Sequence, residues 1–78
     1  MLYNAIEVRL ILKVFSEKLK ELRLAEGYTQ MQISELLNLR QQSYLRYETG
    51  RGEPNLETLV KIAKIFDVST DYLLGIED

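Results

Sequence analysis

The side chains of this chain best suited to recognising a ligand are amides and guanidinium groups that gather between residues 40 and 51. Gln41, Gln42 and Arg46 follow one another closely, and Arg40 and Arg51 stand on either side of them. A Gln amide donates and accepts hydrogen bonds at once, and an Arg guanidinium donates two in parallel. These groups can read adenine and guanine edges in a DNA major groove. The pattern therefore predicts a polar recognition surface.

Catalytic and metal-binding chemistry is poorly represented in the sequence. The chain contains no Cys and no His, which removes the thiol nucleophile, the usual zinc ligands and the commonest general base. We also find no Asp/Glu cluster and no Gly-rich phosphate loop at catalytic spacing. We therefore expect no enzyme activity, no metal site and no cofactor.

Residues 41–48 place their polar side chains on one face if the segment is a helix. At about 100° per residue, four side chains occupy a continuous arc of roughly 140°. They are Gln41, Gln42, Leu45 and Arg46. Tyr44 and Tyr47 fall on the opposite side, with Ser43 beside them. The alternative, which composition alone favours, is an ordinary solvated helix face.

A second helix must hold that face at a fixed angle, and residues 29–48 together predict a helix-turn-helix. Thr29 and Gln32 have the spacing of a Thr-x-x-Gln capping box, which begins a helix. Asn38 suits the left-handed turn that must precede the helix at 41–48.

Three further helices are expected to complete the fold. The first begins near Ser16 as its N-cap and stops at Gly27; the fourth follows Asn55; the fifth follows Ser69 and ends at Gly75. The buried stripe expected for the fourth helix is Leu56, Leu59, Val60, Ala63 and Phe66. Five helices with short links predict an all-α orthogonal bundle.

The segment before this bundle follows a different pattern. Between residues 5 and 14, apolar side chains alternate with mostly polar ones, which favours a β-strand over a helix that continues into the next segment. We therefore divide the chain into an N-terminal extension, 1–14, and a DNA-binding domain, 15–78. A lone strand leaves its backbone unpaired, so strand 5–14 could pair with its copy in a homodimer. A flexible extension is the alternative.

The overall charge argues against nucleic-acid binding, but its distribution does not. The net charge of the 78 residues is −2, whereas binding to phosphates calls for excess Lys and Arg. Between Arg40 and Arg51, however, Glu48 is the one acid among the basic residues, and acids collect near the C-terminus. The chain has no long apolar run and no basic leader, so we expect a cytoplasmic protein without a membrane span.

The ordered set of motifs along the chain resembles the helix-turn-helix of the lambdoid phage repressor and Cro family, also called the XRE family. The resemblance covers about residues 15–75 and implies a five-helix lambda-repressor-like DNA-binding domain. The segments that carry it are Gly27-Tyr28-Thr29-Gln30, Ile33-Ser34-Glu35-Leu36-Leu37, Arg40 through Gly50, Pro54, Leu56-Glu57-Thr58-Leu59, Ala63 and Tyr72-Leu73-Leu74-Gly75.

The resemblance also implies roles for individual residues. Positions matching Gln41, Gln42 and Arg46 read bases, and Leu45 lies among them. Phosphate contacts are implied for Gln30, Ser43 and Arg51, and Arg40 adds a cation near the phosphates where the family often has a capping Ser or Thr. Arg23 and Glu48 match a charged pair that ties the first helix to the end of the recognition helix.

We therefore expect sequence-specific binding of double-stranded DNA by a dimeric transcriptional regulator, most simply a repressor, on a near-palindromic operator. A different class of function remains open at this point: an antitoxin or other protein-interaction module that grips its partner with the N-terminal arm.

Overall fold

The computed structural model describes residues 4–76, which form five helices and no strand. Residues 1–3 of the predicted extension, and the acids Glu77 and Asp78, lie outside the described residues. The helices are α1 (Ala5–Ala25), α2 (Gln30–Leu36), α3 (Gln41–Glu48), α4 (Leu56–Phe66) and α5 (Thr70–Leu73). The predicted all-α fold is confirmed.

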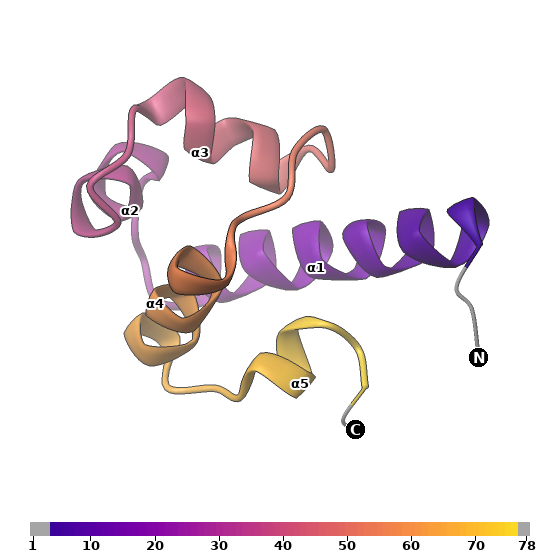
Figure 1. Cartoon of the computed structure of the whole chain (residues 1–78). Helices are drawn as coiled ribbons and strands as arrows, with labels where there is room; N and C mark the ends of the chain where they lie inside the picture. Colours follow the sequence, from indigo (N-terminus) through magenta and orange to yellow (C-terminus); the bar gives the residue numbers. More distant parts are fainter. Residues whose placement is uncertain (1–3, 77–78) are drawn as a thin grey trace.

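A single small core holds the helices together. α1 lies across the molecule, with α3 on one side of it and α5 on the other (Figure 1). α2 packs against α3, and α4 packs against α5. The fully buried apolar side chains come from every helix and include Leu19, Ile33, Tyr44, Ile62 and Leu73. Because each helix supplies part of one core, the angle between α2 and α3 is fixed by tertiary packing.

The predicted strand at residues 5–14 is wrong, since this segment forms the first half of α1. Asn4 caps the helix: its side chain accepts a hydrogen bond from the Glu7 amide, and the Glu7 carboxylate accepts one from the Asn4 amide. Ser16, expected to be the N-cap, instead lies buried in the middle of α1 and donates to the Lys13 carbonyl. The idea of dimerisation through strand pairing falls with the strand.

The alternating pattern misled because it contains a helical pattern as well. Val8, Leu12, Phe15 and Leu19 recur every three or four residues, which places them along one side of a helix. Phe15 and Leu19 on that side are buried, whereas Val8, in the projecting first turns, is exposed. A lone strand would leave its backbone donors and acceptors unpaired, whereas a helix satisfies them within the segment. The Asn-x-x-Glu capping box was the local signal that should have decided for the helix.

The first turns of α1 extend past the rest of the molecule (Figure 1). Ile6 is 68% exposed and Leu10 is 56% exposed, although both are large apolar side chains. Gly75, which follows α5, packs against α1 further along that helix. A Cβ at Gly75 would lie 2.8 Å from Cγ1 of Val14. The close approach explains why a glycine stands at this position.

The expected apolar stripe of α4 is confirmed only in part. Ala63 and Phe66 are buried and Leu59 packs against the core, but Leu56 is 81% exposed and Val60 is half-exposed. Leu56 is the first residue of α4, where no other helix reaches over it. The side chain at a helix end can follow the apolar period and still face solvent.

Candidate nucleic-acid interface

The side of α3 that faces away from α1 carries four exposed side chains. These are Gln41, Gln42, Leu45 and Arg46. On the opposite side Tyr44 and Glu48 are buried, and Tyr47 packs edge-on against Tyr44 with ring centroids 6.4 Å apart. The helix therefore has one face committed to the core and one face, rich in hydrogen-bonding groups, that is free to contact another molecule.

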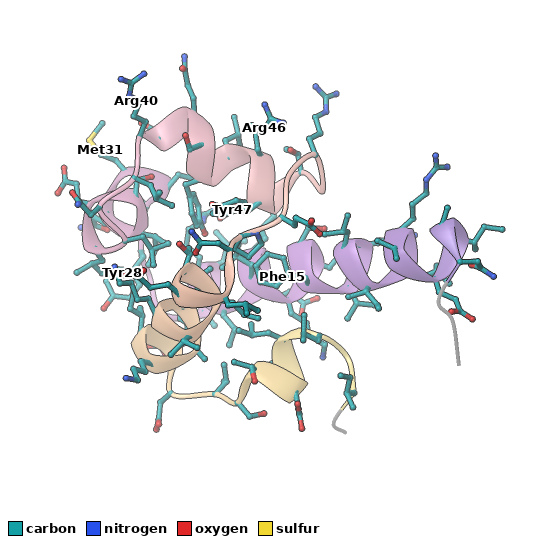
Figure 2. All side chains as sticks on the ribbon, in the orientation of Figure 1. Phe15, Tyr28, Met31, Arg40, Arg46 and Tyr47 are labelled. Carbon is teal, nitrogen blue, oxygen red and sulfur yellow. The ribbon has the colours of Figure 1, made fainter. Side chains whose placement is uncertain are left out.

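Exposed arginines stand at both ends of α3. Arg40 occupies the N-cap position and makes no side-chain capping hydrogen bond, and both it and Arg46 project away from the body of the protein (Figure 2). At the other end, the Arg46 Nη2 donates to the carbonyl of Arg51 at 3.2 Å. This bond steadies the turn that holds the exposed Arg51 beside the helix. The surface around α3 is thus basic although the whole chain is acidic.

The turn between α2 and α3 sets the direction of that face. Thr29 and Gln32 form the predicted capping box at the start of α2, and Asn38 adopts a left-handed φ of 57° after it. Arg40 then has an extended backbone, so α3 begins in a new direction. The two helices pack against each other, and the geometry of a helix-turn-helix results.

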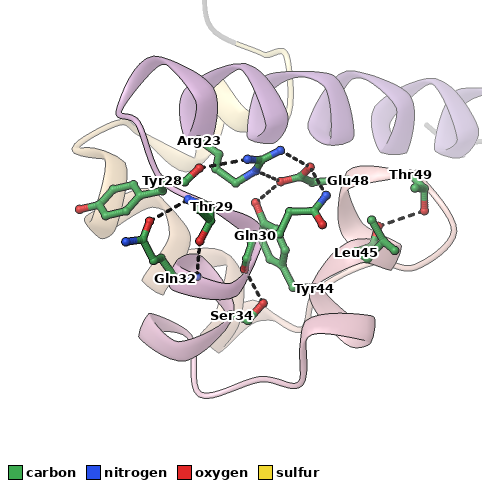
Figure 3. Close-up of polar contacts among 10 residues, drawn as sticks. All are labelled: Arg23, Tyr28, Thr29, Gln30, Gln32, Ser34, Tyr44, Leu45, Glu48 and Thr49. Carbon is green, nitrogen blue, oxygen red and sulfur yellow. Dashed lines mark hydrogen bonds and ion pairs between the residues drawn. The ribbon is translucent and has the colours of Figure 1, made fainter.

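A buried ion pair ties the end of α3 to α1. The Arg23 Nε lies 2.5 Å from Glu48 Oε2, and Arg23 Nη2 donates to Glu48 Oε1 at 3.1 Å (Figure 3). The side chains are 9% and 2% exposed. Arg23 also donates through Nη1 to the Tyr28 carbonyl, at 3.0 Å, in the loop before α2. One guanidinium therefore contacts both the end of α3 and the loop that enters α2.

Two further donors complete the environment of the Glu48 carboxylate. The Tyr44 hydroxyl donates to Oε2, and the Gln30 amide donates to Oε1 at 3.3 Å. Gln30 is the first residue of α2 and is half-buried. Its backbone carbonyl accepts a hydrogen bond from the buried Ser34 hydroxyl at 2.6 Å. Among the described residues no buried side-chain nitrogen or oxygen lacks a partner. Such a fully satisfied network fixes geometry.

The electrostatics of this network follow from its hydrogen bonds. Burial acts to raise the pKa of the Glu48 carboxyl, but the hydrogen bonds from Arg23, Tyr44 and Gln30 outweigh it and hold that pKa below its ordinary value. The hydrogen bond to Glu48 raises the pKa of Arg23. Burial, together with the bond to Glu48, raises the pKa of the Tyr44 hydroxyl. The pair stays ionised and Tyr44 stays neutral near pH 7.

Sequence reasoning missed parts of this site. It placed Tyr44 on the core side of α3 but assigned no role to its hydroxyl, and it gave none to the Tyr28 carbonyl. The four-residue spacing of Tyr44 and Glu48, which puts them on one helix face, was the available signal. The Ser43 side chain, assigned to DNA backbone contact, is half-buried at the edge of the exposed face.

Neither a metal-binding cluster nor a membrane-spanning helix is found among the described residues. No group of three or more acidic, His or Cys side chains in residues 4–76 lies close enough to hold a metal ion. In the same part of the chain, no helix has the length and apolar character needed to cross a membrane.

The arrangement of α2 and α3 within the five-helix bundle is that of a helix-turn-helix domain. The helix-turn-helix family model matches residues 19–73, and the chain belongs to that family. A prophage-derived HTH-type transcriptional regulator of Bacillus subtilis, YonR, is 44% identical over 61 residues, which cover 78% of this chain and 56% of that protein. The phage CTXphi repressor RstR of Vibrio cholerae is 41% identical over 76% of this chain and 53% of its own length.

A solved structure agrees in three dimensions. The crystal structure of a transcriptional regulator from Listeria innocua superposes with a TM-score of 0.77 and 34% sequence identity, over 82% of this chain and 60% of that one. The chain spans about half the length of the curated relatives it matches. The family is thereby shown.

Proposed function

We propose that this protein binds a specific sequence of double-stranded DNA by inserting α3 into the major groove, and that it represses transcription there. The observation that carries the proposal is the exposed amide and guanidinium face of α3, held at a fixed angle by the buried Arg23–Glu48 pair. A rigid support matters because base contacts depend on geometry. The repressor assignment rests on the likeness to the phage repressor RstR.

The proposed base contacts follow from side-chain chemistry. Gln41 and Gln42 lie in the first turn of α3, and their amides can pair with adenine through two hydrogen bonds. Arg46, one turn later, can pair with guanine. The 40% exposed Leu45 side chain offers an apolar contact for a thymine methyl.

Phosphate contacts are proposed for the residues around this face. Arg40 and Arg51 supply charge at its two ends, and Ser43 supplies a hydroxyl at its edge. Gln30 is proposed to reach a phosphate from the start of α2 while it holds Glu48. Such contacts position the protein on DNA without reading its sequence.

We further propose that two copies bind together on a near-palindromic operator. A dimer would place its two recognition helices in successive major grooves about 34 Å apart. Ile6, Val8 and Leu10 are exposed on the first turns of α1, and a helix that is apolar on several sides usually has a partner. These side chains are the proposed contact between the copies.

Selection from random duplex DNA, followed by affinity measurements at two salt concentrations, tests the proposal. We expect enrichment of one motif with two-fold symmetry, bound with a steep dependence on salt. The absence of any enriched motif would contradict sequence-specific binding. It would direct the search to a protein partner of the N-terminal part of α1, as in an antitoxin.

A further inference from the structure

The first half of α1 carries two basic side chains beside the end of the recognition helix. We propose that Arg9 and Lys13 bind DNA phosphates and extend the contact surface beyond the helix-turn-helix. This inference rests on the proposed function. It concerns residues that precede the segment matched by the family model, 19–73.

A surface hollow brings the two residues together with the end of α3. Its volume is about 190 Å³, and its lining consists of Arg9, Leu12, Lys13, Ser16, Thr49 and Gly50. The turn after α3 packs directly on α1, since a Cβ on Gly50 would lie 3.6 Å from the Ser16 Oγ. Lys13 precedes Ser16 by about one helical turn and Arg9 by about two. The hollow therefore joins α1 to the basic end of α3.

The turn at residues 49–51 connects the end of α3 to the hollow on α1. The Arg46 side chain bonds to the carbonyl of Arg51, Arg51 follows Gly50 in the chain, and Gly50 lies against α1 in the hollow. In Figure 1 the first half of α1 runs on past the end of α3. A duplex lying along α3 could thus reach this part of α1 as well.

The charges of Arg9 and Lys13 are available to an anion. Both side chains are exposed, and four residues apart on a helix they lie on the same side. No ion pair joins either of them to an acid within residues 4–76, although Glu17 is one turn beyond Lys13. No acidic residue lines the hollow. Two like charges left unpaired on one helix face repel each other, and bound phosphates would relieve that repulsion.

The position of the hollow favours phosphate over base contacts. The amides that suit base edges lie in the first turn of α3, whereas the hollow adjoins Thr49 and Gly50, just past its last residue, Glu48. Long, flexible cationic side chains at the margin of a docked helix meet the sugar-phosphate backbone first. The contact should therefore add affinity for every sequence alike.

The test compares wild-type protein with the double variant Arg9→Gln/Lys13→Gln on the selected operator and on random duplex. Loss of two phosphate contacts should reduce the slope of log K against log [salt] by about 1.8, since each contributes about 0.9. At 0.15 M salt that difference corresponds to a loss of roughly 30-fold. We expect the same factor on both DNAs, because phosphates carry no sequence information.

Two control variants isolate the effect. Lys61→Gln/Lys64→Gln removes the same charge from exposed positions on α4, and should leave the salt slope unchanged. Arg9→Lys/Lys13→Arg keeps both charges and should bind as wild type does. Circular dichroism and urea unfolding check that all variants are folded, which we expect for exposed positions.

The outcomes separate this inference from the proposed function. If the wild-type protein binds the operator with a steep salt dependence and the double Gln variant has the same salt slope, this inference is overturned and the proposed function stands. A loss of affinity for the operator without a loss for random duplex would also overturn this inference, because it would indicate that Arg9 or Lys13 reads bases. Wild-type protein without salt-dependent DNA binding would overturn the proposed function and the inference together.

Discussion

Three side chains converge on the carboxylate of Glu48, and each comes from a different helix. Arg23 belongs to α1, Gln30 to α2 and Tyr44 to α3 itself. A buried carboxylate with this many donors is stable as an anion, but it depends on all of them. The orientation of α3 therefore rests on a few polar contacts as much as on apolar packing.

Substitution of Glu48→Gln should lower the free energy of unfolding by about 3–5 kcal/mol, because it leaves the buried Arg23 charge without its partner. Urea unfolding measures the change. Lys61→Gln is the matched control, since it breaks the exposed Lys61–Glu57 pair and should cost no more than about 1 kcal/mol. If the two substitutions lowered the free energy of unfolding by similar amounts, the buried pair would stabilise the fold no more than the exposed pair does.

The depressed pKa of Glu48 predicts loss of stability in acid. A carboxyl whose pKa is lower in the folded protein stabilises the fold above its unfolded value of about 4.3, and this contribution is lost as pH falls through the folded pKa. Thermal unfolding between pH 7 and pH 2 should therefore show a falling midpoint. In Glu48→Gln the decline should be shallower, and an identical decline in both proteins would contradict the assignment.

At the scale of the element, α3 divides its roles between two faces. The face with Tyr44 and Glu48 fixes where the helix lies, and the face with Gln41, Gln42 and Arg46 remains exposed. Because different side chains carry the two roles, substitutions on the exposed face should alter binding without altering the fold. Recognition can thus be tested separately from stability.

Gln41→Ala and Gln42→Ala should each weaken binding to the selected operator by about 1–3 kcal/mol and leave binding to random duplex almost unchanged. Titrations with labelled duplexes of both kinds give the two affinities. Arg51→Ala serves as the contrasting variant, because loss of a phosphate contact should weaken both DNAs alike and lower the salt slope by about 1. Equal losses on both DNAs for the Gln variants would remove the base-reading assignment.

At the scale of the whole molecule, the first half of α1 gives the protein an asymmetric shape. Its N-terminal turns project from a small body (Figure 1), and the apolar side chains of Ile6, Val8 and Leu10 on them are exposed. Arg9 and Lys13 lie on the same projecting segment. One helix extension could therefore join the copies of a dimer and add phosphate contacts.

The double variant Ile6→Gln/Leu10→Gln should shift the protein from dimer to monomer, because it removes exposed apolar surface without disturbing the buried core. Sedimentation equilibrium over a range of concentrations measures the shift. Leu56→Gln is the control, since Leu56 is exposed on a different helix. A wild-type protein that is monomeric at every concentration, or a variant dimer of unchanged affinity, would contradict the proposed contact.

The sequence by itself determined four of the five helices closely, because their signals are local. Thr29, Asn55 and Ser69 cap α2, α4 and α5 through hydrogen bonds to the amide three residues on. Gly27 and Asn38 end helices in the left-handed conformation. The type and spacing of the side chains on α3 likewise predicted which of its faces is exposed, and the recognition surface and its DNA contacts stay predictions.

Only the tertiary structure decided the remainder, because it depends on contacts between distant residues. The apolar pattern of residues 5–14 fits two periods, and the continuous helix with its packing against the core selects one of them. Resemblance to a family indicated the Arg23–Glu48 pair across 25 residues of sequence, but not the Tyr44 hydroxyl that joins it. The hollow between Arg9, Lys13 and the end of α3 exists only once α1 and α3 have packed together.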